Sequence, residues 1–156
     1  MYQEEFMLKA IDLAKRARSE NEVPIGAVIV KDNKIIGSGY NKRENSKNAL
    51  SHAEIIAINE ACENISNFRL ENADIYVTLE PCAMCAGAIV NARLKNLYFG
   101  AFDNRFGAVG SKLNVLDSGL NYKVNFSGGY FEEQIVKIMR DFFVKIREKN
   151  KKSYQD

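Results

Sequence analysis

The alternation of β-branched runs with helical patterns of apolar residues restricts the fold of this chain more than any other feature of its sequence. Short apolar runs bounded by turn residues predict strands at 25–30, 35–40 and 74–79. Further strands are predicted at 97–101 and 122–126. Stretches with helical spacing lie between and around these runs. The alternation therefore predicts an α/β fold, a three-layer α/β/α sandwich in which helices cover both faces of a five-stranded sheet.

Four stretches carry apolar residues at the spacing of a helix face. The first three cover 4–18, 52–63 and 81–93. The fourth has its apolar residues at 135–146. In the second stretch Cys62 is expected to be a small buried core residue, and the apolar set is Ile55, Ile56, Ile58 and Ala61. Pro81 is expected in the first turn of the third helix, which suits proline. Loops are predicted at 41–51 and 103–111, and 112–130 is ambiguous, with a short helix at 113–116.

Length and composition indicate one globular domain. A chain of 156 residues has the size of a single domain, and 46% hydrophobic and 27% charged residues are ordinary values. We expect one domain over 1–150 and a basic, flexible tail over 151–156. The first ten residues lack the basic start and apolar run of a signal peptide, and no apolar stretch is long enough to cross a bilayer. The chain is therefore expected to be cytoplasmic, with no membrane partner.

The charge of the chain is concentrated near its carboxyl end. A net charge of +2 is too small to indicate a nucleic-acid partner. The segment 140–152, however, holds six basic residues and two acidic ones. Lysine and arginine contacts to phosphates supply sequence-independent affinity for nucleic acid, but a solvated helix end has the same composition. The segment is compatible with both.

Two short motifs hold the side chains with metal chemistry. His52-Ala53-Glu54 is followed, thirty residues after the histidine, by Pro81-Cys82-Ala83-Met84-Cys85. One imidazole and two thiolates suit zinc and leave a fourth tetrahedral position open, as in catalytic zinc sites. Cys82 and Cys85 are three residues apart, so on a helix they share a face, and the first turn of a helix favours thiolate. His52, Cys82 and Cys85 are therefore the candidate ligands of one zinc ion.

Glu54 is the candidate acid–base residue of this site, and its presence favours a catalytic over a purely structural metal site. A helix points it away from the direction of His52, so it need not bind the ion. A carboxylate beside zinc-bound water, whose pKa falls to about 7, can take a proton and pass it to a substrate. By itself, a Cys-x-x-Cys motif is also compatible with redox chemistry or with half of a structural zinc site. His52 is the only histidine and a second Cys-x-x-Cys is absent from the sequence, so a structural site would lack its fourth ligand unless a carboxylate or another chain supplied it.

His-x-Glu followed by Pro-Cys-x-x-Cys is the signature of the zinc-dependent nucleobase deaminases. Beyond this signature, the chain resembles the bacterial tRNA-specific adenosine deaminases over nearly its whole length, at 23–28, Asn41, 76–88, 99–103 and 107–111. The resemblance implies a cytidine deaminase-like fold with a mixed sheet and one Zn²⁺ per subunit. The implied reaction is hydrolytic deamination of adenosine to inosine at the wobble position of a tRNA anticodon. Zinc-bound hydroxide would attack C6, with Glu54 as the proton shuttle.

The resemblance also implies which residues bind the RNA. They are Asn41, Ala53, Asp103, Asn104, Arg105, Phe143 and Arg147. The first two would hold the flipped base, the next three would contact nucleotides around it, and the last two would pack against the anticodon loop. The family forms homodimers, with the third helix at the interface. The implied partners are therefore a tRNA anticodon stem-loop and a second copy of the chain.

Four positions depart from the pattern of this family: Leu50, Asn91, Phe102 and Tyr122. They lie outside the reacting groups and near the substrate loops, so they affect the expected target context more than the reaction type. Two other functions stay open on the sequence. One is deamination of a free nucleobase, guanine or cytosine, at the same site. The other is a non-catalytic zinc-containing RNA-binding protein, against which Glu54 argues, because a structural metal site needs no acid–base residue.

Overall fold

The computed structural model describes residues 1–154. The helices are α1 (Glu4–Ser19), α2 (Arg43–Ser46), α3 (Ala53–Ile65), α4 (Ala83–Asn91), the 3-10 helix η1 (Val115–Asp117) and α5 (Glu132–Ser153). The strands are β1 (Gly26–Lys31), β2 (Lys34–Tyr40), β3 (Asp74–Leu79), β4 (Asn96–Ala101) and β5 (Asn125–Gly128). None of the helices in this part of the chain has both the length and the apolar character needed to cross a membrane.

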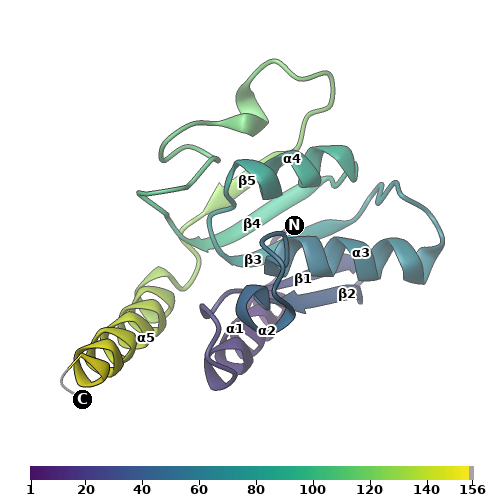
Figure 1. Ribbon diagram of the computed structural model, residues 1–156. Coiled ribbons are helices and arrows are strands. Elements are labelled where there is room, and N and C mark those ends of the chain that lie inside the picture. Colours follow the sequence, from purple (N-terminus) through teal and green to yellow (C-terminus); the bar gives the residue numbers. More distant parts are fainter. Residues whose placement is uncertain (155–156) are drawn as a thin grey trace.

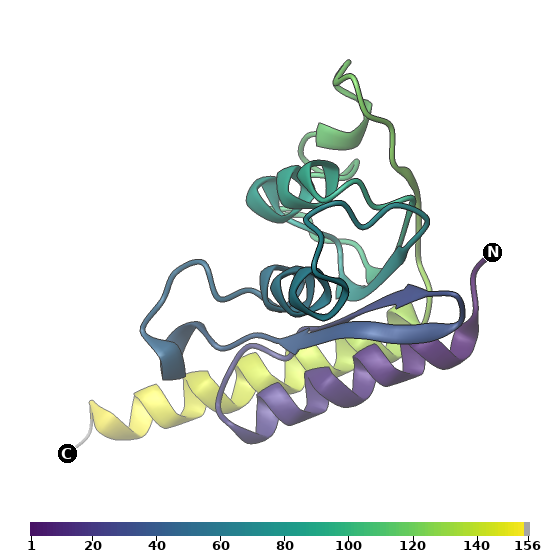
Figure 2. The same ribbon diagram turned by 90° about the vertical axis from the view of Figure 1, so that its right-hand side faces the viewer.

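The five strands form one mixed sheet in the order β2-β1-β3-β4-β5. Strand β1 is antiparallel to β2 and β3, whereas β3, β4 and β5 run parallel. Helices α1 and α5 lie side by side on one face of the sheet, and α3 and α4 cover the other (Figure 1 and Figure 2). The predicted three-layer α/β/α sandwich with a central mixed five-stranded sheet is confirmed.

The central strands are apolar on both faces because each face is covered by helices. Ile75 and Val77 of β3 pack in the layer that contains α3 and α4, and Tyr76 between them packs in the layer that contains α1 and α5. Successive side chains of a strand point to opposite faces. A strand buried on both sides can therefore be a continuous apolar run, which is the pattern that predicted β1, whereas alternation and β-branched residues predicted β3.

Helix α3 lies unusually close to β2 because small residues line the contact. The helix buries a row of alanines at every fourth position, Ala53, Ala57 and Ala61. On the strand, a Cβ added to Gly39 would lie 2.5 Å from the carbonyl oxygen of Ala53 and 2.9 Å from the nitrogen of Ala57. This contact fixes the start of α3, where His52 and Glu54 stand.

The predicted apolar face of α3 is therefore only partly its buried face. Ala61 is buried as expected and the half-buried Ile58 packs against the core, whereas Ile55 and Ile56 are only half-buried. Large side chains would hold the helix away from β2, so the small residues take the buried face instead. Cys62 is also half-buried, at the edge of the core rather than within it.

Several boundaries differ from the sequence prediction. Cys82 is the N-cap of α4, so Pro81 precedes the helix rather than standing in its first turn. The predicted loop 41–51 contains α2, and the 3-10 helix η1 replaces the predicted helix at 113–116. Strand β5 begins at Asn125 instead of residue 122, because pairing with β4 defines it. Helix α5 runs to Ser153, so 151–153 of the predicted tail are helical, and 155–156 lie outside the described residues.

Candidate metal and catalytic site

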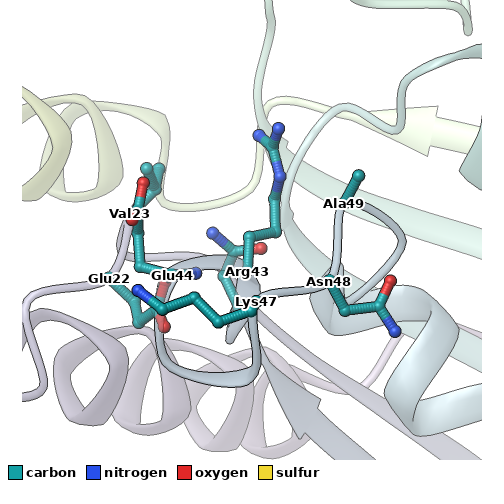
Figure 3. A pocket seen from close by; sticks show the side chains of 8 residues that line it. Glu22, Val23, Arg43, Glu44, Lys47, Asn48 and Ala49 are labelled. Atoms are coloured by element: carbon teal, nitrogen blue, oxygen red, sulfur yellow. Dashed lines mark hydrogen bonds between the residues drawn. The ribbon is translucent and has the colours of Figure 1, made fainter.

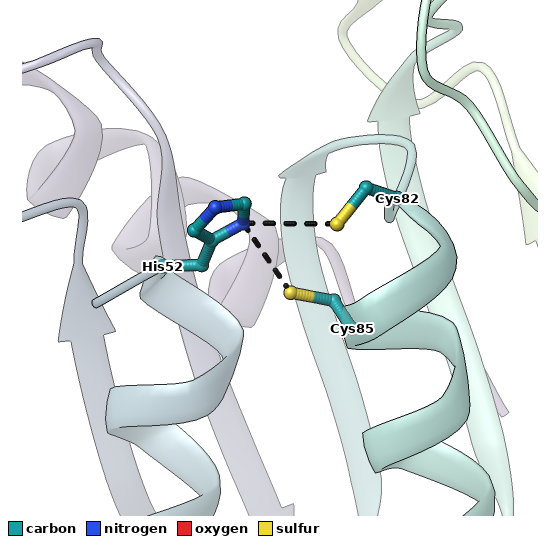
Figure 4. Close-up of side chains that lie close together, drawn as sticks. All are labelled: His52, Cys82 and Cys85. Atoms are coloured by element: carbon teal, nitrogen blue, oxygen red, sulfur yellow. Dashed lines mark hydrogen bonds between the residues drawn. The ribbon is translucent and has the colours of Figure 1, made fainter. Parts of the chain in front are cut away.

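Three side chains able to bind a metal ion meet beyond the carboxyl end of β3 (Figure 4). The Nδ1 atom of His52 lies 3.7 Å from Sγ of Cys82 and 3.5 Å from Sγ of Cys85. All three ligand atoms lie within 4.8 Å of one another. The fold thus brings the three predicted ligands together in a group that could hold a metal ion, which we call the metal group.

Two helix starts position these ligands. His52 and Cys82 are the N-cap residues of α3 and α4, and both have extended backbones. Neither side chain caps its own helix with a hydrogen bond, so both remain available to a metal ion. Cys85 stands in the first turn of α4 and is fully buried. Unpaired N–H groups at a helix start carry partial positive charge, which favours thiolates there.

The two cysteines of the metal group have opposite acid–base behaviour. Hydrogen bonding with Cys85 lowers the pKa of Cys82 to about 4. The same contact, together with burial, raises the pKa of Cys85. Hydrogen bonding with Cys82 also raises the pKa of His52. At neutral pH the metal-free group therefore contains a thiolate held by both neighbours, an arrangement ready to exchange its protons for a divalent cation.

Glu54 stands beside the metal group without being one of its ligands. It is the second residue of α3, and its side chain is buried, with 4% of the residue exposed. Burial raises the pKa of its carboxyl to about 7. A group with a pKa near neutrality both accepts and donates protons at neutral pH, which is what a general acid–base residue requires.

A pocket of about 240 Å³ opens next to Asn41 (Figure 3). It is lined by Glu22, Val23, Asn41, Arg43, Glu44, Lys47, Asn48 and Ala49. The buried carboxylate of Glu22 accepts hydrogen bonds from the backbone N–H groups of Glu44 at 3.0 Å and Asn45 at 2.8 Å. These bonds fix α2 as one wall of the pocket. Ala53, the other residue predicted to hold the base, is buried between His52 and Glu54.

Glu80 holds the loop that follows β4. Its carboxylate accepts hydrogen bonds from the backbone N–H groups of Asp103 at 3.1 Å, Val109 at 3.0 Å and Ser111 at 3.1 Å, and from the Ser111 hydroxyl. The residue is only 2% exposed. Burial alone would raise the pKa of Glu80, but these hydrogen bonds outweigh it and lower the pKa.

The predicted RNA contacts of this loop have different surroundings. Asp103 is half-buried, and its Oδ1 accepts hydrogen bonds from the N–H groups of Arg105 at 2.9 Å and Phe106 at 3.2 Å. Its carboxylate therefore shapes the turn of the loop. Asn104 and Arg105 are exposed.

Phe143 and Arg147 are exposed on α5, in the layer opposite α3 and α4 (Figure 2). The fold does not bring them to the metal group. A second pocket, of about 410 Å³, lies between the end of α1 and α5. It is lined by other residues: Arg18, Ser19, Asn21, Phe142, Lys145, Ile146, Lys149 and Asn150.

Comparison with known proteins identifies the family. The MafB19-like deaminase family matches residues 1–147. The tRNA-specific adenosine deaminase of Rickettsia bellii is 51% identical over 145 residues, which cover 91% of this chain and 100% of the relative. The tRNA-specific adenosine deaminase of Bacillus subtilis is 42% identical over 147 residues, 94% of this chain and 91% of that protein. This chain belongs to the tRNA-specific adenosine deaminase family.

A solved structure agrees with this membership. It comes from work on A-to-I editing by tRNA:A34 deaminases at the wobble position of transfer RNA. At 39% sequence identity it matches the fold with a TM-score of 0.81, and the match covers 87% of this chain and 99% of that chain. The cytidine deaminase-like fold expected of a tRNA-specific adenosine deaminase is confirmed.

The four departures from the pattern of the tRNA-specific adenosine deaminases have separate surroundings. The amide of Asn91 donates a hydrogen bond to the carbonyl oxygen of Gly87, and the Tyr122 hydroxyl donates one to that of Arg93. Both side chains thus have local structural partners. Leu50 and Phe102 are exposed.

Sequence reasoning missed two buried carboxylates of this chain, Glu22 and Glu80. Both accept hydrogen bonds from backbone segments that lie more than twenty residues further along the chain. The sequence holds a signal for Glu80. An acidic residue between a buried strand and the Pro81-Cys82 motif needs polar partners, because a buried charge is costly without them.

Proposed function

We propose that this protein deaminates adenosine to inosine at the wobble position of a tRNA anticodon. The observation that carries the proposal is a buried Glu54 beside the His52–Cys82–Cys85 metal group, in a chain of the tRNA-specific adenosine deaminase family. Metal-dependent hydrolysis requires a metal ion with one coordination position open for water and an acid–base residue beside it, and this arrangement offers both. Because tRNA is the proposed substrate, the cytoplasm is the proposed place of the reaction.

Zinc is the proposed ion, one per subunit. Zinc–nitrogen bonds of about 2.0 Å and zinc–sulfur bonds of about 2.3 Å, at tetrahedral angles, separate nitrogen and sulfur by about 3.5 Å. The distances of 3.5 and 3.7 Å from His52 Nδ1 to the two sulfur atoms support this assignment. His52, Cys82 and Cys85 would hold the ion and leave one position free for water.

Glu54 is the proposed proton shuttle. When bound, zinc lowers the pKa of a coordinated water to about 7 and so provides the nucleophile at neutral pH. As water adds to C6 of adenine, Glu54 accepts one proton and delivers it to N1. It then moves the proton of the new C6 hydroxyl to the amine, and ammonia leaves. Adenosine and water thus become inosine and ammonia, and the pKa of about 7 suits both transfers.

The RNA is proposed to contact three regions of the protein. Asn41 borders the pocket beside α2, and the Ala53 backbone at the start of α3 would also face the flipped base. The Asp103–Arg105 loop would contact neighbouring nucleotides of the anticodon stem-loop, and the exposed Phe143 and Arg147 would contact the loop from α5. A homodimer with α4 at the interface is part of this proposal.

The decisive experiment offers the zinc-loaded protein an anticodon stem-loop with adenosine at the wobble position. We expect inosine and one ammonia per converted base, measured by nuclease digestion and mass spectrometry. Glu54→Ala is expected to lower the rate by at least about 100-fold while the protein keeps its zinc. Cys82→Ala is expected to lose the zinc. A stem-loop with guanosine at the same position serves as the control substrate.

Each contrary outcome identifies a different error. Activity retained in Glu54→Ala would remove the acid–base role from that residue. Full zinc stoichiometry in Cys82→Ala would overturn the metal assignment. Ammonia released from free guanine or cytosine, with none from the stem-loop, would make the protein a free-base deaminase. Stem-loop binding without any deamination would favour the non-catalytic RNA-binding function.

A further inference from the structure

Glu80 lies between the metal group and the loop that follows β4. In the chain it stands between the end of β3 and Pro81-Cys82, so its backbone leads directly into a residue of the metal group. In space its carboxylate receives four hydrogen bonds from the loop 103–111, which we call the substrate loop. One side chain thus connects the metal group to the substrate loop.

The carboxylate of Glu80 is stabilised by hydrogen bonds from this loop and not by a positively charged side chain of the described residues. No lysine or arginine of residues 1–154 forms an ion pair with it. A buried carboxylate without a cation depends on its hydrogen-bond donors, and each donor lost leaves a buried polar group unsatisfied. The dependence therefore runs in both directions: the loop stabilises the charge, and the charge holds the loop in one conformation.

Two further contacts show how closely the loop fits around Glu80. The N–H group of Ala108 donates a hydrogen bond to the carbonyl oxygen of Pro81 at 2.9 Å. At Gly107, an added Cβ would lie 2.5 Å from the carboxyl carbon of Glu80. The same Cβ would lie even closer to the carbonyl oxygen of Asp103. Only a residue without a side chain therefore fits there, and Gly107 allows the loop backbone to approach the carboxylate.

The substrate loop displays groups that suit RNA. Phe106 is 71% exposed, and the neighbouring Arg105 is exposed as well. Exposed aromatic rings and guanidinium groups stack on unpaired bases, which is how proteins bind single-stranded RNA loops. The turn that carries both residues is fixed by Asp103, whose own N–H is bonded to Glu80. The position of the displayed groups therefore depends on Glu80.

We propose that Glu80 is a positioning residue that sets the substrate loop relative to the metal group and thereby determines the affinity for the RNA. This inference rests on the proposed function, because it assigns the loop to the tRNA substrate. It predicts that loss of the Glu80 contacts weakens RNA binding while the metal group and the proton transfers stay intact.

The test compares Glu80→Gln with the wild type. Glutamine keeps the size of the side chain but replaces one acceptor oxygen with a donor NH₂ group, which cannot pair with a backbone N–H. We expect KM and the dissociation constant for the wobble-adenosine stem-loop to rise about tenfold, as loss of one charged hydrogen bond predicts. The kcat is expected to stay within about twofold, with one zinc per chain. With the NH₂ group at the Oε1 position, the Ser111 hydroxyl can accept from it, and only the Asp103 N–H loses its acceptor. Amide hydrogen exchange is therefore expected to accelerate at Asp103.

Two other variants complete the design. Ser111→Ala removes one of the four hydrogen bonds and is expected to give a smaller rise in KM. It also keeps the test decisive if Glu80→Gln does not fold. Glu71→Gln makes the same chemical change at an exposed position and is expected to leave KM, exchange and zinc content unchanged.

The outcomes separate this inference from the proposed function. If the wild type makes no inosine, the proposed function fails. The exchange rates and stem-loop affinity then still decide whether Glu80 positions the loop for RNA. Unchanged KM, affinity and exchange in Glu80→Gln would overturn the inference. A fall in kcat that parallels loss of zinc would also overturn it, since Glu80 would then support only the metal group.

Discussion

At the scale of single residues, the site depends on ionisable groups that the fold keeps out of water. Folding moves the carboxyl of Glu54 from water, where its pKa is 4.5, to a buried position where its pKa is about 7. The folded protein thus holds this proton more tightly than the unfolded chain. The stability that follows is fully present below about pH 4.5 and is lost as the pH rises through 7. A residue suited to proton transfer therefore destabilises the metal-free protein at neutral and alkaline pH.

Replacement of Glu54 by Gln is expected to remove this pH dependence. In the metal-free protein, Glu54→Gln should have a free energy of unfolding close to that of the wild type at low pH. At pH 8.5 it should be more stable by about 3 kcal/mol, which corresponds to the pKa difference. Urea unfolding in the presence of a chelator, at both pH values, measures the difference. The same difference between the two proteins at both pH values would contradict the buried, proton-binding state of Glu54.

At the scale of secondary structure elements, the metal group depends on how closely α3 approaches β2. The alanines of the helix and Gly39 of the strand allow a contact that larger side chains would prevent. Helix position matters here because His52 and Glu54 both stand at its first turn. A small displacement of α3 would move a metal ligand and the acid–base residue together.

Gly39→Ala tests this dependence. The new methyl group would press against the backbone of Ala53 and Ala57, so we expect the free energy of unfolding to fall by about 1–3 kcal/mol. We also expect weaker zinc binding, measured by competition with a chelator, because Ala53 adjoins His52. Ser38→Ala is the matched control, one residue away on the same strand and facing the other side of the sheet. Equal effects of the two variants on stability and zinc affinity would show that α3 does not depend on this contact.

At the scale of the whole molecule, a feature could be predicted from the sequence when the residues that determine it lie close together in the chain. His52, Glu54, Cys82 and Cys85 could be selected because their chemistry and spacing lie within two short motifs. The buried face of α3 could not, because Gly39 of a different element determines it. For Glu80 the sequence indicates only a need for polar partners. Their identity could not be predicted, since they lie 23 to 31 residues further along the chain.

The proposed homodimer gives the last prediction. On the outer side of α4, a Cβ added to Gly87 would have no neighbour within 4 Å, so a single chain tolerates a side chain there. If α4 forms the interface, Gly87→Arg brings two positive charges together and should dissociate the dimer while each chain stays folded. Sedimentation should then give the 17.6 kDa of one chain instead of twice that mass.

Gln134→Arg makes the same change in charge at an exposed position on α5, in the opposite layer, and is the control. It should leave the dimer intact, because α5 lies across the sheet from α4 (Figure 2). A monomeric wild type, or a dimer that persists in Gly87→Arg, would exclude α4 as the interface. If the Gly87→Arg monomer also fails to bind the stem-loop, the RNA site includes residues of both subunits. The exposed Phe143 and Arg147, which the fold keeps away from their own metal group, would then be candidates to serve the site of the second subunit.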